Sequence, residues 1–233
     1  MKSVLAALAV SSALVLAGCG PSSPAVDPSE YGAVVEEAPA KLLTEAQIQD
    51  ALLTLKDLPN GWSFDSEYGD GGGFDSRTTS EDPGCAKLTA ALSSADDTAT
   101  SGEGSVTFAK SEFGPFLTQT VTSRGDDDAV KSMKSLRSAL KGCDYFTMFD
   151  DTRGMRSDYV VSDLSFPKLG DDMVAMTLRS TTQGQSIDMP MVIARVDQTL
   201  VMLAWFELGG SAGTQDFESV ARTAVKKVKK ASA

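Results

Sequence analysis

The chain has 233 residues, with 21 Lys and Arg against 32 Asp and Glu, which gives a formal net charge of −11 at neutral pH. This acidic excess argues against a nucleic-acid binder, whose affinity rests on neutralising phosphates. The sequence contains no histidine, which excludes Ser-His-Asp and Cys-His catalysis and the usual zinc and iron ligand sets.

The first predicted element is an export signal. Lys2 precedes an apolar run over residues 4–17, which is too short to span a bilayer as a mature helix. The run ends in Leu-Ala-Gly-Cys, a pattern that resembles a lipobox, in which the cysteine thiol receives a diacylglyceryl group before cleavage. Residues 1–18 are therefore predicted to be a lipoprotein signal peptide and Cys19 the lipidated mature N-terminus. The alternative is an ordinary secretory signal with a chance cysteine.

Residues 19–41 are predicted to be a lipidated, disordered tether, because they are rich in Pro, Ser, Ala and Glu and lack apolar periodicity. About twenty such residues span about 25 Å on average as a random coil, which keeps the following domain near its membrane. Residues 42–233 are predicted to form one extracytoplasmic domain without internal repeats. We expect the acyl chains on Cys19 to hold it at the cell membrane.

The cysteine count agrees with an oxidising compartment. Assigning Cys19 to lipid leaves Cys85 and Cys143 as a pair. A disulfide is the expected outcome in an exported protein. The alternative is two free, buried thiols.

Order is predicted to begin at Thr44, whose spacing to Gln47 is that of a capping box. A helix with one apolar stripe should run to about Leu55. A turn over residues 57–61, with its Pro and Gly, then places Trp62 at a defined position. That indole is either a core anchor or a platform for a ligand.

The middle of the chain predicts a loop, two helices and a strand pair. Residues 66–83 are rich in Gly and Asp and read as a solvated loop; calcium binding is the alternative, although the EF-hand spacing is missing. A short helix should open at Cys85, and period-two patterns around residues 106–108 and 117–121 predict an antiparallel pair. A second amphipathic helix is predicted from about residue 127 to 141.

Short turns separate five strand-like segments in the last third, which predicts an antiparallel meander. These are Tyr145–Phe149, Tyr159–Phe166, Val174–Thr181, Ile187–Val196 and Thr199–Phe206. Pro190 should lie at an edge or a bulge, because it cannot donate to a central ladder. The whole pattern predicts an α+β fold, with a mainly antiparallel sheet of about six or seven strands packed with three or four helices.

The last predicted element is an amphipathic helix over about residues 216–230. Near its end lie four lysines, Lys226, Lys227, Lys229 and Lys230. These either bind anionic lipid near the anchor or are solvated and complement the helix dipole.

Arg195 departs from the apolar pattern of its segment. The apolar residues from Ile187 to Ile193 share one face, and Arg195 continues that face at its end. The guanidinium either binds a ligand carboxylate or phosphate, or pairs within the protein. Trp62 and Arg195 are thus the candidate ligand-binding residues, and no catalytic residue, metal ligand or cofactor site is predicted.

Several strings resemble a known family. These are Asp57–Ser63, the spaced Cys85 and Cys143, Phe166–Asp171 and the closing amphipathic helix. They resemble actinobacterial lipoproteins that are similar to the extracellular sensor domain of the PknH-type receptor kinases. The resemblance covers about residues 42–228 and implies an antiparallel sheet with helices packed around it and a cleft for an envelope ligand. That sensor domain has two disulfides where this chain can form one. The Mog1-like envelope lipoproteins, with a sheet-and-helix sandwich, are a related resemblance.

We therefore expect a membrane-anchored, extracytoplasmic lipoprotein with a sensor-like domain that binds an envelope lipid, glycan or protein and is not an enzyme. One alternative is a cell-envelope hydrolase, which would need two carboxylates from different strands facing one cleft. Another is a scaffold lipoprotein whose exposed face meets a protein partner.

Overall fold

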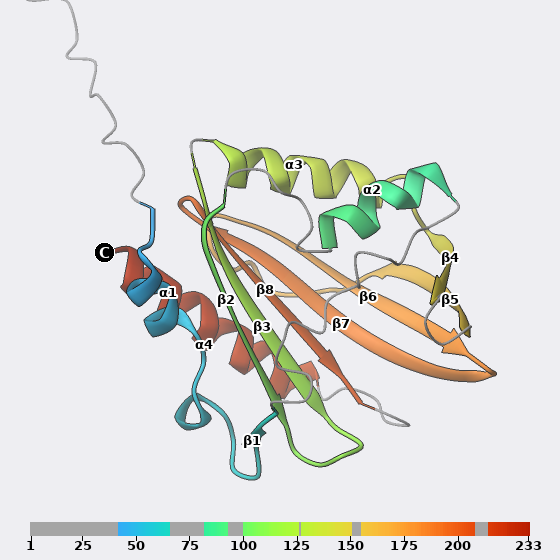
Figure 1. Cartoon of the computed structure of the whole chain (residues 1–233), viewed down its shortest axis with the longest axis horizontal. Coiled ribbons are helices and arrows are strands. Elements are labelled where there is room, and N and C mark those ends of the chain that lie inside the picture. The colour runs from blue at the N-terminus through green and yellow to red at the C-terminus, as the bar shows by residue number, and fades with distance from the viewer. Residues whose placement is uncertain (1–41, 66–81, 93–99, 126, 151–154, 208–213) are drawn as a thin grey trace, which may run out of the picture. The chain divides into compact units, whose positions relative to one another are not determined.

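The computed structural model describes residues 42–65, 82–92, 100–125, 127–150, 155–207 and 214–233 (Figure 1). Residues 39–233 form one compact unit. The predicted signal peptide, Cys19 and the tether lie outside the described residues, as does most of the predicted loop over residues 66–83. None of the described helices is long and apolar enough to cross a membrane.

An antiparallel sheet of eight strands organises this unit, in the order β1-β2-β3-β8-β7-β6-β5-β4. The strands are β1 (Ser63–Phe64), β2 (Thr100–Ala109), β3 (Phe116–Arg124), β4 (Tyr145–Asp150), β5 (Met155–Asp163), β6 (Asp172–Thr182), β7 (Gln185–Val196) and β8 (Thr199–Phe206). This confirms the predicted α+β class with one strand more than expected. The two-residue β1 is too short to show a period-two pattern.

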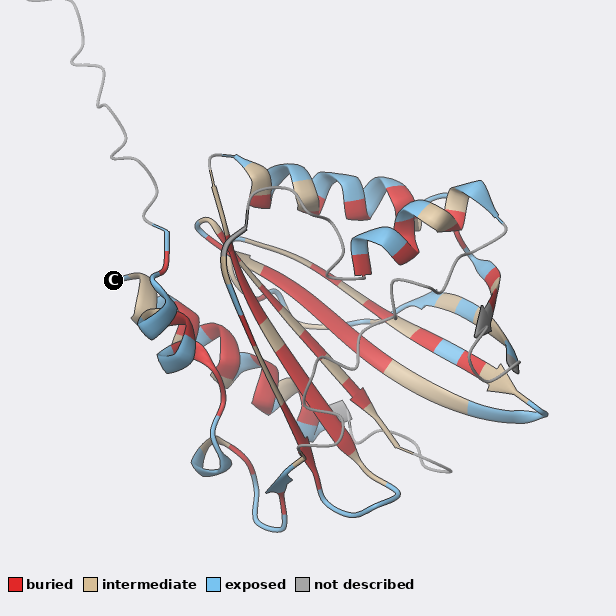
Figure 2. Cartoon of the chain, viewed as in Figure 1, coloured by how far each residue is buried: buried red, intermediate tan, exposed pale blue. Residues whose placement is uncertain are grey.

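Helices lie on both faces of the sheet (Figure 1). The helices α1 (Glu45–Ala51) and α4 (Thr214–Ser232) cover one face, and α2 (Pro83–Leu92) and α3 (Asp128–Leu140) lie over the other. A short 3₁₀ turn, η2 (Leu55–Asp57), follows α1. Each pair encloses its own hydrophobic core, which Figure 2 shows as buried stripes on the helices and on the strands beneath them.

The core under α1 and α4 is built from alternating residues of the central strands and the inner stripe of α4. The predicted inward residues of α4 are all buried, namely Phe217, Val220, Ala221, Ala224 and Val228. Close approach of α1 to the sheet requires Gly104, because a Cβ there would lie 2.7 Å from a methyl of Ile48. Among the described residues, Leu43 is the first in the chain to contribute to either core.

The first helix begins as predicted and ends early. The Thr44 side chain accepts from the Gln47 amide, and the Gln47 side chain accepts from the Thr44 amide, which completes the capping box. The helix stops at Ala51 rather than near Leu55. The reason lies on β3, where the Gln119 side chain accepts a hydrogen bond from the Leu53 amide at 2.6 Å. That amide therefore donates to a side chain of the sheet and not to the carbonyl four residues earlier, as it would in a continuing helix.

Gln119 is a fully buried polar side chain between β3 and α1. Besides accepting from Leu53, its amide nitrogen donates to the Ala51 carbonyl at 3.2 Å. The carboxamide therefore satisfies two backbone groups that the end of α1 leaves unpaired.

The predicted strand over residues 159–166 is shifted toward the N-terminus. Strand β5 spans Met155–Asp163 and pairs with β4 and β6. Phe166 leaves the sheet and packs edge-on against Phe217 of α4, with ring centroids 5.6 Å apart. The predicted strand extends too far because the apolar character of Phe166 serves packing on a helix and not pairing in the sheet.

Pro190 lies where the sheet divides. Strand β7 pairs with β6 over almost its whole length but with β8 only from Met191 to Val196. Pro190 immediately precedes the residues that pair with β8, so at Pro190 strand β7 has no neighbour on the β8 side. This position suits proline, which has no backbone N–H to donate. Beyond Met191 the strands β7 and β8 diverge (Figure 1).

A disulfide joins Cys85 to Cys143, as predicted. Cys85 lies in the first turn of α2, and Cys143 follows α3. Both residues are buried in the second core. The bond therefore fixes the start of α2 to the end of α3.

Replacing both cysteines by alanine should lower the free energy of unfolding by about 4 kcal/mol, because the disulfide closes a chain separation of 58 residues in the unfolded state. Urea unfolding followed by tryptophan fluorescence measures the change. The parent protein after reduction with dithiothreitol should match the double variant. An unchanged unfolding midpoint in both would contradict the prediction.

Gln119→Leu should destabilise the domain by about 2–5 kcal/mol, because it leaves two buried backbone groups without partners. Thr120→Val, the next residue on the opposite face of β3, is the matched control and should cost less than about 1 kcal/mol. Both are measured by urea unfolding. Equal losses in the two variants would show that the Gln119 carboxamide has no special role.

Candidate functional site

The face of the sheet under α2 and α3 has an apolar half and a polar half. In β6 and β7 this face carries Val174, Met176, Met191 and Ile193, which pack with both helices. In β2 and β3 the same face carries a row of hydroxyls and one carboxylate. We call this row the hydroxyl ladder; it consists of Glu103, Ser105, Thr107, Thr118, Thr120 and Thr122.

The hydroxyl ladder is held by cross-strand hydrogen bonds. The hydroxyl oxygens of Thr107 and Thr118 lie 3.2 Å apart, and Thr122 donates to the Glu103 carboxylate at 3.2 Å. These pairs follow the register of β2 and β3, which brings the two strands' polar residues directly opposite each other. The result is a polar strip beside an apolar core.

A pocket of about 60 Å³ lies where the two halves meet. One wall is apolar and comes from α2, β7 and β8, with Ala91, Leu92, Ile193, Leu200 and Met202. The other wall is polar and comes from β2 and β3, with Glu103, Thr120, Thr122 and Arg124. A cavity that holds benzene measures about 150 Å³, so this pocket admits a small group or one end of a longer ligand.

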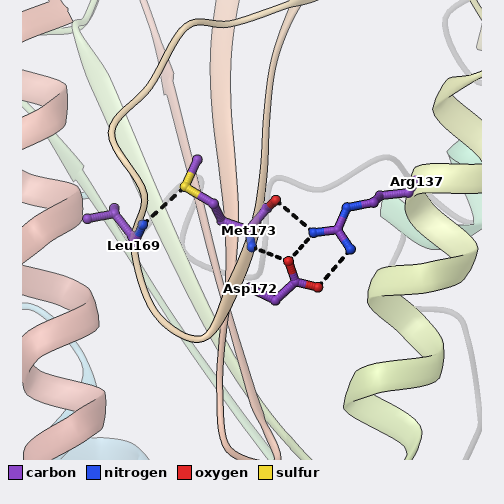
Figure 3. A network of polar contacts seen from close by, with 4 residues as sticks. All are labelled: Arg137, Leu169, Asp172 and Met173. Carbon is purple, nitrogen blue, oxygen red and sulfur yellow. Dashed lines mark hydrogen bonds and ion pairs between the residues drawn. The ribbon is translucent and has the colours of Figure 1, made fainter.

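An ion pair fixes α3 to the sheet (Figure 3). The Arg137 guanidinium donates to both carboxylate oxygens of Asp172 at the start of β6 and to the Met173 carbonyl at 3.1 Å. These hydrogen bonds from Arg137 are the main reason that the pKa of Asp172 lies below its ordinary value. The contact therefore persists at neutral pH and would be lost only in acid, as Asp172 becomes protonated.

Arg195 is paired within the protein. Its guanidinium donates to the Asp197 carbonyl at 2.8 Å and lies 3.6 Å from the Asp171 carboxylate, which leaves its side chain 21% exposed. The loop before β6 can approach this strand closely because residue 170 is glycine. A Cβ there would lie 2.3 Å from the Arg195 carbonyl oxygen. Of the two readings of this residue, internal pairing is the one that the structure shows.

Trp62 is packed in the core under α1 and α4, with 8% of its surface exposed. It meets Trp205 of β8 edge-on, with ring centroids 5.0 Å apart, and the Lys110 ammonium lies 5.4 Å from its ring centroid. Arg195 continues the row of Met191 and Ile193 on the other face of the sheet. The two candidate ligand residues therefore do not line one cavity, and a ligand role for either stays a prediction.

The residues of the polar wall were not singled out from the sequence. A signal for part of it exists, since hydroxyls alternate through both members of a predicted strand pair, Ser105 and Thr107 in one strand and Thr118, Thr120 and Thr122 in the other. Within the ranges that the structure describes, no three Cys, Asp or Glu side chains gather as a metal site would require.

No protein-family model and no curated protein matches the chain. Among solved structures, it is similar to the crystal structure of the extracellular domain of PknH from Mycobacterium tuberculosis, with a TM-score of 0.60 and 13% sequence identity. That match covers 82% of this chain and 99% of the other. A putative uncharacterized protein from Mycobacterium smegmatis matches with a TM-score of 0.44 and 13% identity, over 80% and 97% of the two chains. The first match confirms the expected resemblance in fold.

Proposed function

We propose that the protein is an exported lipoprotein, anchored through Cys19 to the extracytoplasmic face of the cell membrane, whose sensor-like domain binds a small envelope ligand in the pocket beside the hydroxyl ladder. The fold shared with an extracellular domain supports this placement. The Cys85–Cys143 disulfide supports it too, because such bonds persist in oxidising compartments.

The observation that carries ligand binding is the contrast between the two walls of the pocket. Leu200 and Met202 line it with apolar surface, while Glu103, Thr122 and Arg124 line it with a carboxylate, a hydroxyl and a guanidinium. Binding sites commonly combine an apolar lining with a few convergent polar groups that orient the ligand. A ligand with a short apolar part and a hydroxylated or charged end, such as the end of an envelope lipid or glycan, fits this arrangement.

We propose binding rather than hydrolysis. A glycosidase mechanism places two carboxyl groups on either side of the scissile bond. Glu103 is the one carboxylate among the residues that line the described pocket, and it accepts a hydrogen bond from Thr122. Turnover of any ligand found for this pocket would replace the proposal with the hydrolase alternative.

A thermal-shift screen against envelope lipids, glycans and peptidoglycan fragments tests the site. A ligand present at a hundred times its dissociation constant stabilises a protein by about 2.7 kcal/mol, which corresponds to a rise in Tm of about 5–10 °C for a domain of this size. Ala91→Trp, at the exposed rim of the pocket, should abolish the rise. Ala90→Trp, the exposed neighbour on α2 outside the lining, should keep it.

A ligand that stabilises both tryptophan variants as well as the parent would place its site elsewhere. A screen in which no compound raises the Tm of the parent would count against a small-molecule ligand and in favour of a protein partner.

The anchor is tested by metabolic labelling with a radiolabelled fatty acid. The native chain should take up label, and Cys19→Ala should remain unlabelled, because the acyl chains are attached to that thiol. The Cys85→Ala, Cys143→Ala double variant should be labelled like the parent. An unlabelled native chain would refute lipidation and leave the pocket proposal untouched.

A further inference from the structure

The outward face of α4 carries a cluster of exposed cations. Lys226, Lys229 and Lys230 are all exposed and, at about 100° per residue, lie within about 100° of arc. This arc is opposite the buried stripe of the helix, which includes Ala224 and Val228. We call these three residues the basic face of α4. Amphipathicity leaves this face to solvent, yet it does not require that the face be basic.

The neighbouring cations of the helix have partners, unlike the basic face. Lys227 lies 2.9 Å from the Asp57 carboxylate, and Arg222 lies 2.7 Å from Glu218 one turn earlier. Lys226, Lys229 and Lys230 make no ion pair with any residue that the structure describes. The chain has a net charge of −11, so a face that carries three lysines without an ion pair to the described residues is locally positive on an acidic protein.

The basic face lies beside the point where the chain enters the domain. The Gln47 side chain of α1 donates to the Ala231 carbonyl of α4 at 2.9 Å, and Leu43 is buried in the same core as Val228. Figure 1 shows α1 against the C-terminal end of α4. Residues 20–41, between Cys19 and this point, would span about 25 Å as a coil. An anchor at Cys19 would thus hold the basic face within reach of the bilayer surface.

We propose that the basic face of α4 docks on anionic phospholipid headgroups of the membrane that holds the anchor. Each lysine near such a surface contributes about a fivefold gain in partitioning, so three give about a hundredfold. That is weak for a free protein and sufficient to orient one that an acyl chain already holds at the surface. The position of the anchor rests on the proposed function, whereas the affinity of the lysines for anionic lipid does not.

The docked orientation has a consequence for the pocket. Helix α4 covers one face of the sheet, and the pocket opens under α2 on the other. With α4 on the headgroups, the pocket is directed away from the bilayer and toward the envelope. The ligand would then be taken from the envelope side rather than from the membrane plane.

Cosedimentation with vesicles tests the proposal on the chain of residues 20–233, which retains the whole folded unit and lacks Cys19. Vesicles of phosphatidylglycerol and phosphatidylcholine in equal parts are compared with pure phosphatidylcholine. At low salt the chain should partition about a hundredfold more strongly onto the anionic vesicles, and about 150 mM salt should weaken the binding because it screens exposed charges.

Lys226→Gln, Lys229→Gln and Lys230→Gln combined should reduce binding to anionic vesicles to the level seen with neutral ones. The matched control is Lys131→Gln, Lys134→Gln and Lys141→Gln, which makes the same change in net charge at exposed positions in and just after α3. This control should bind like the parent.

Equal losses in both triple variants, an undiminished α4 variant, or no preference of the parent for anionic vesicles would each overturn the proposal. None of these outcomes depends on acylation, because residue 19 is missing from the chain tested. A failure of docking can therefore be told apart from a failure of lipidation, because the labelling experiment measures lipidation independently.

Discussion

The pairing of β8 with β3 on one side and β7 on the other is the constraint on which the rest of the structure depends. This last strand of the chain joins the β1-β2-β3 half of the sheet to the half formed by β7, β6, β5 and β4. Its alternate residues supply both cores, since Leu203 and Trp205 face α4 while Met202 faces α2. One strand therefore sets the distance between the hydroxyl ladder and the apolar core. The pocket lies between these two, so its position depends on β8 as well.

The two faces of the sheet differ in how they meet their helices. Under α1 and α4 the contact is apolar apart from polar groups such as Gln119, which completes the hydrogen bonding of the end of α1. Under α2 and α3 the helices cover an apolar half, held by the disulfide and by the Arg137–Asp172 pair. The first face is covered by apolar packing, and the second carries the hydroxyl ladder beside its apolar core. The proposed membrane contact and the proposed ligand site fall on opposite sides because of this division.

Local patterns predicted the local structure well. The capping box at Thr44, the inner stripe of α4 and the shared face of Met191 and Ile193 in β7 each depend on neighbours in sequence, and each is present. The disulfide followed from counting cysteines once Cys19 was set aside. The early end of α1 was not predictable, because the Gln119 side chain that causes it comes from a strand 66 residues away from Leu53. Neither was the pocket, since its walls meet through the pairing of β3 with β8. The partners of Trp62 and Arg195 were not predictable either, because Trp205 and Asp171 are distant in sequence.

The place of β8 also governs when the fold can be completed. Every residue from β1 to β7 precedes it, and α4, which closes the first core, follows it. A chain that crosses a membrane unfolded from its N-terminus would hold two incomplete half-sheets, each with an open edge, until its last 35 residues emerge. Loss of the C-terminal segment would then remove β8, the strand that joins the two halves of the sheet. Closure of the sheet therefore has to wait for this strand, because without it neither half-sheet is joined to the other.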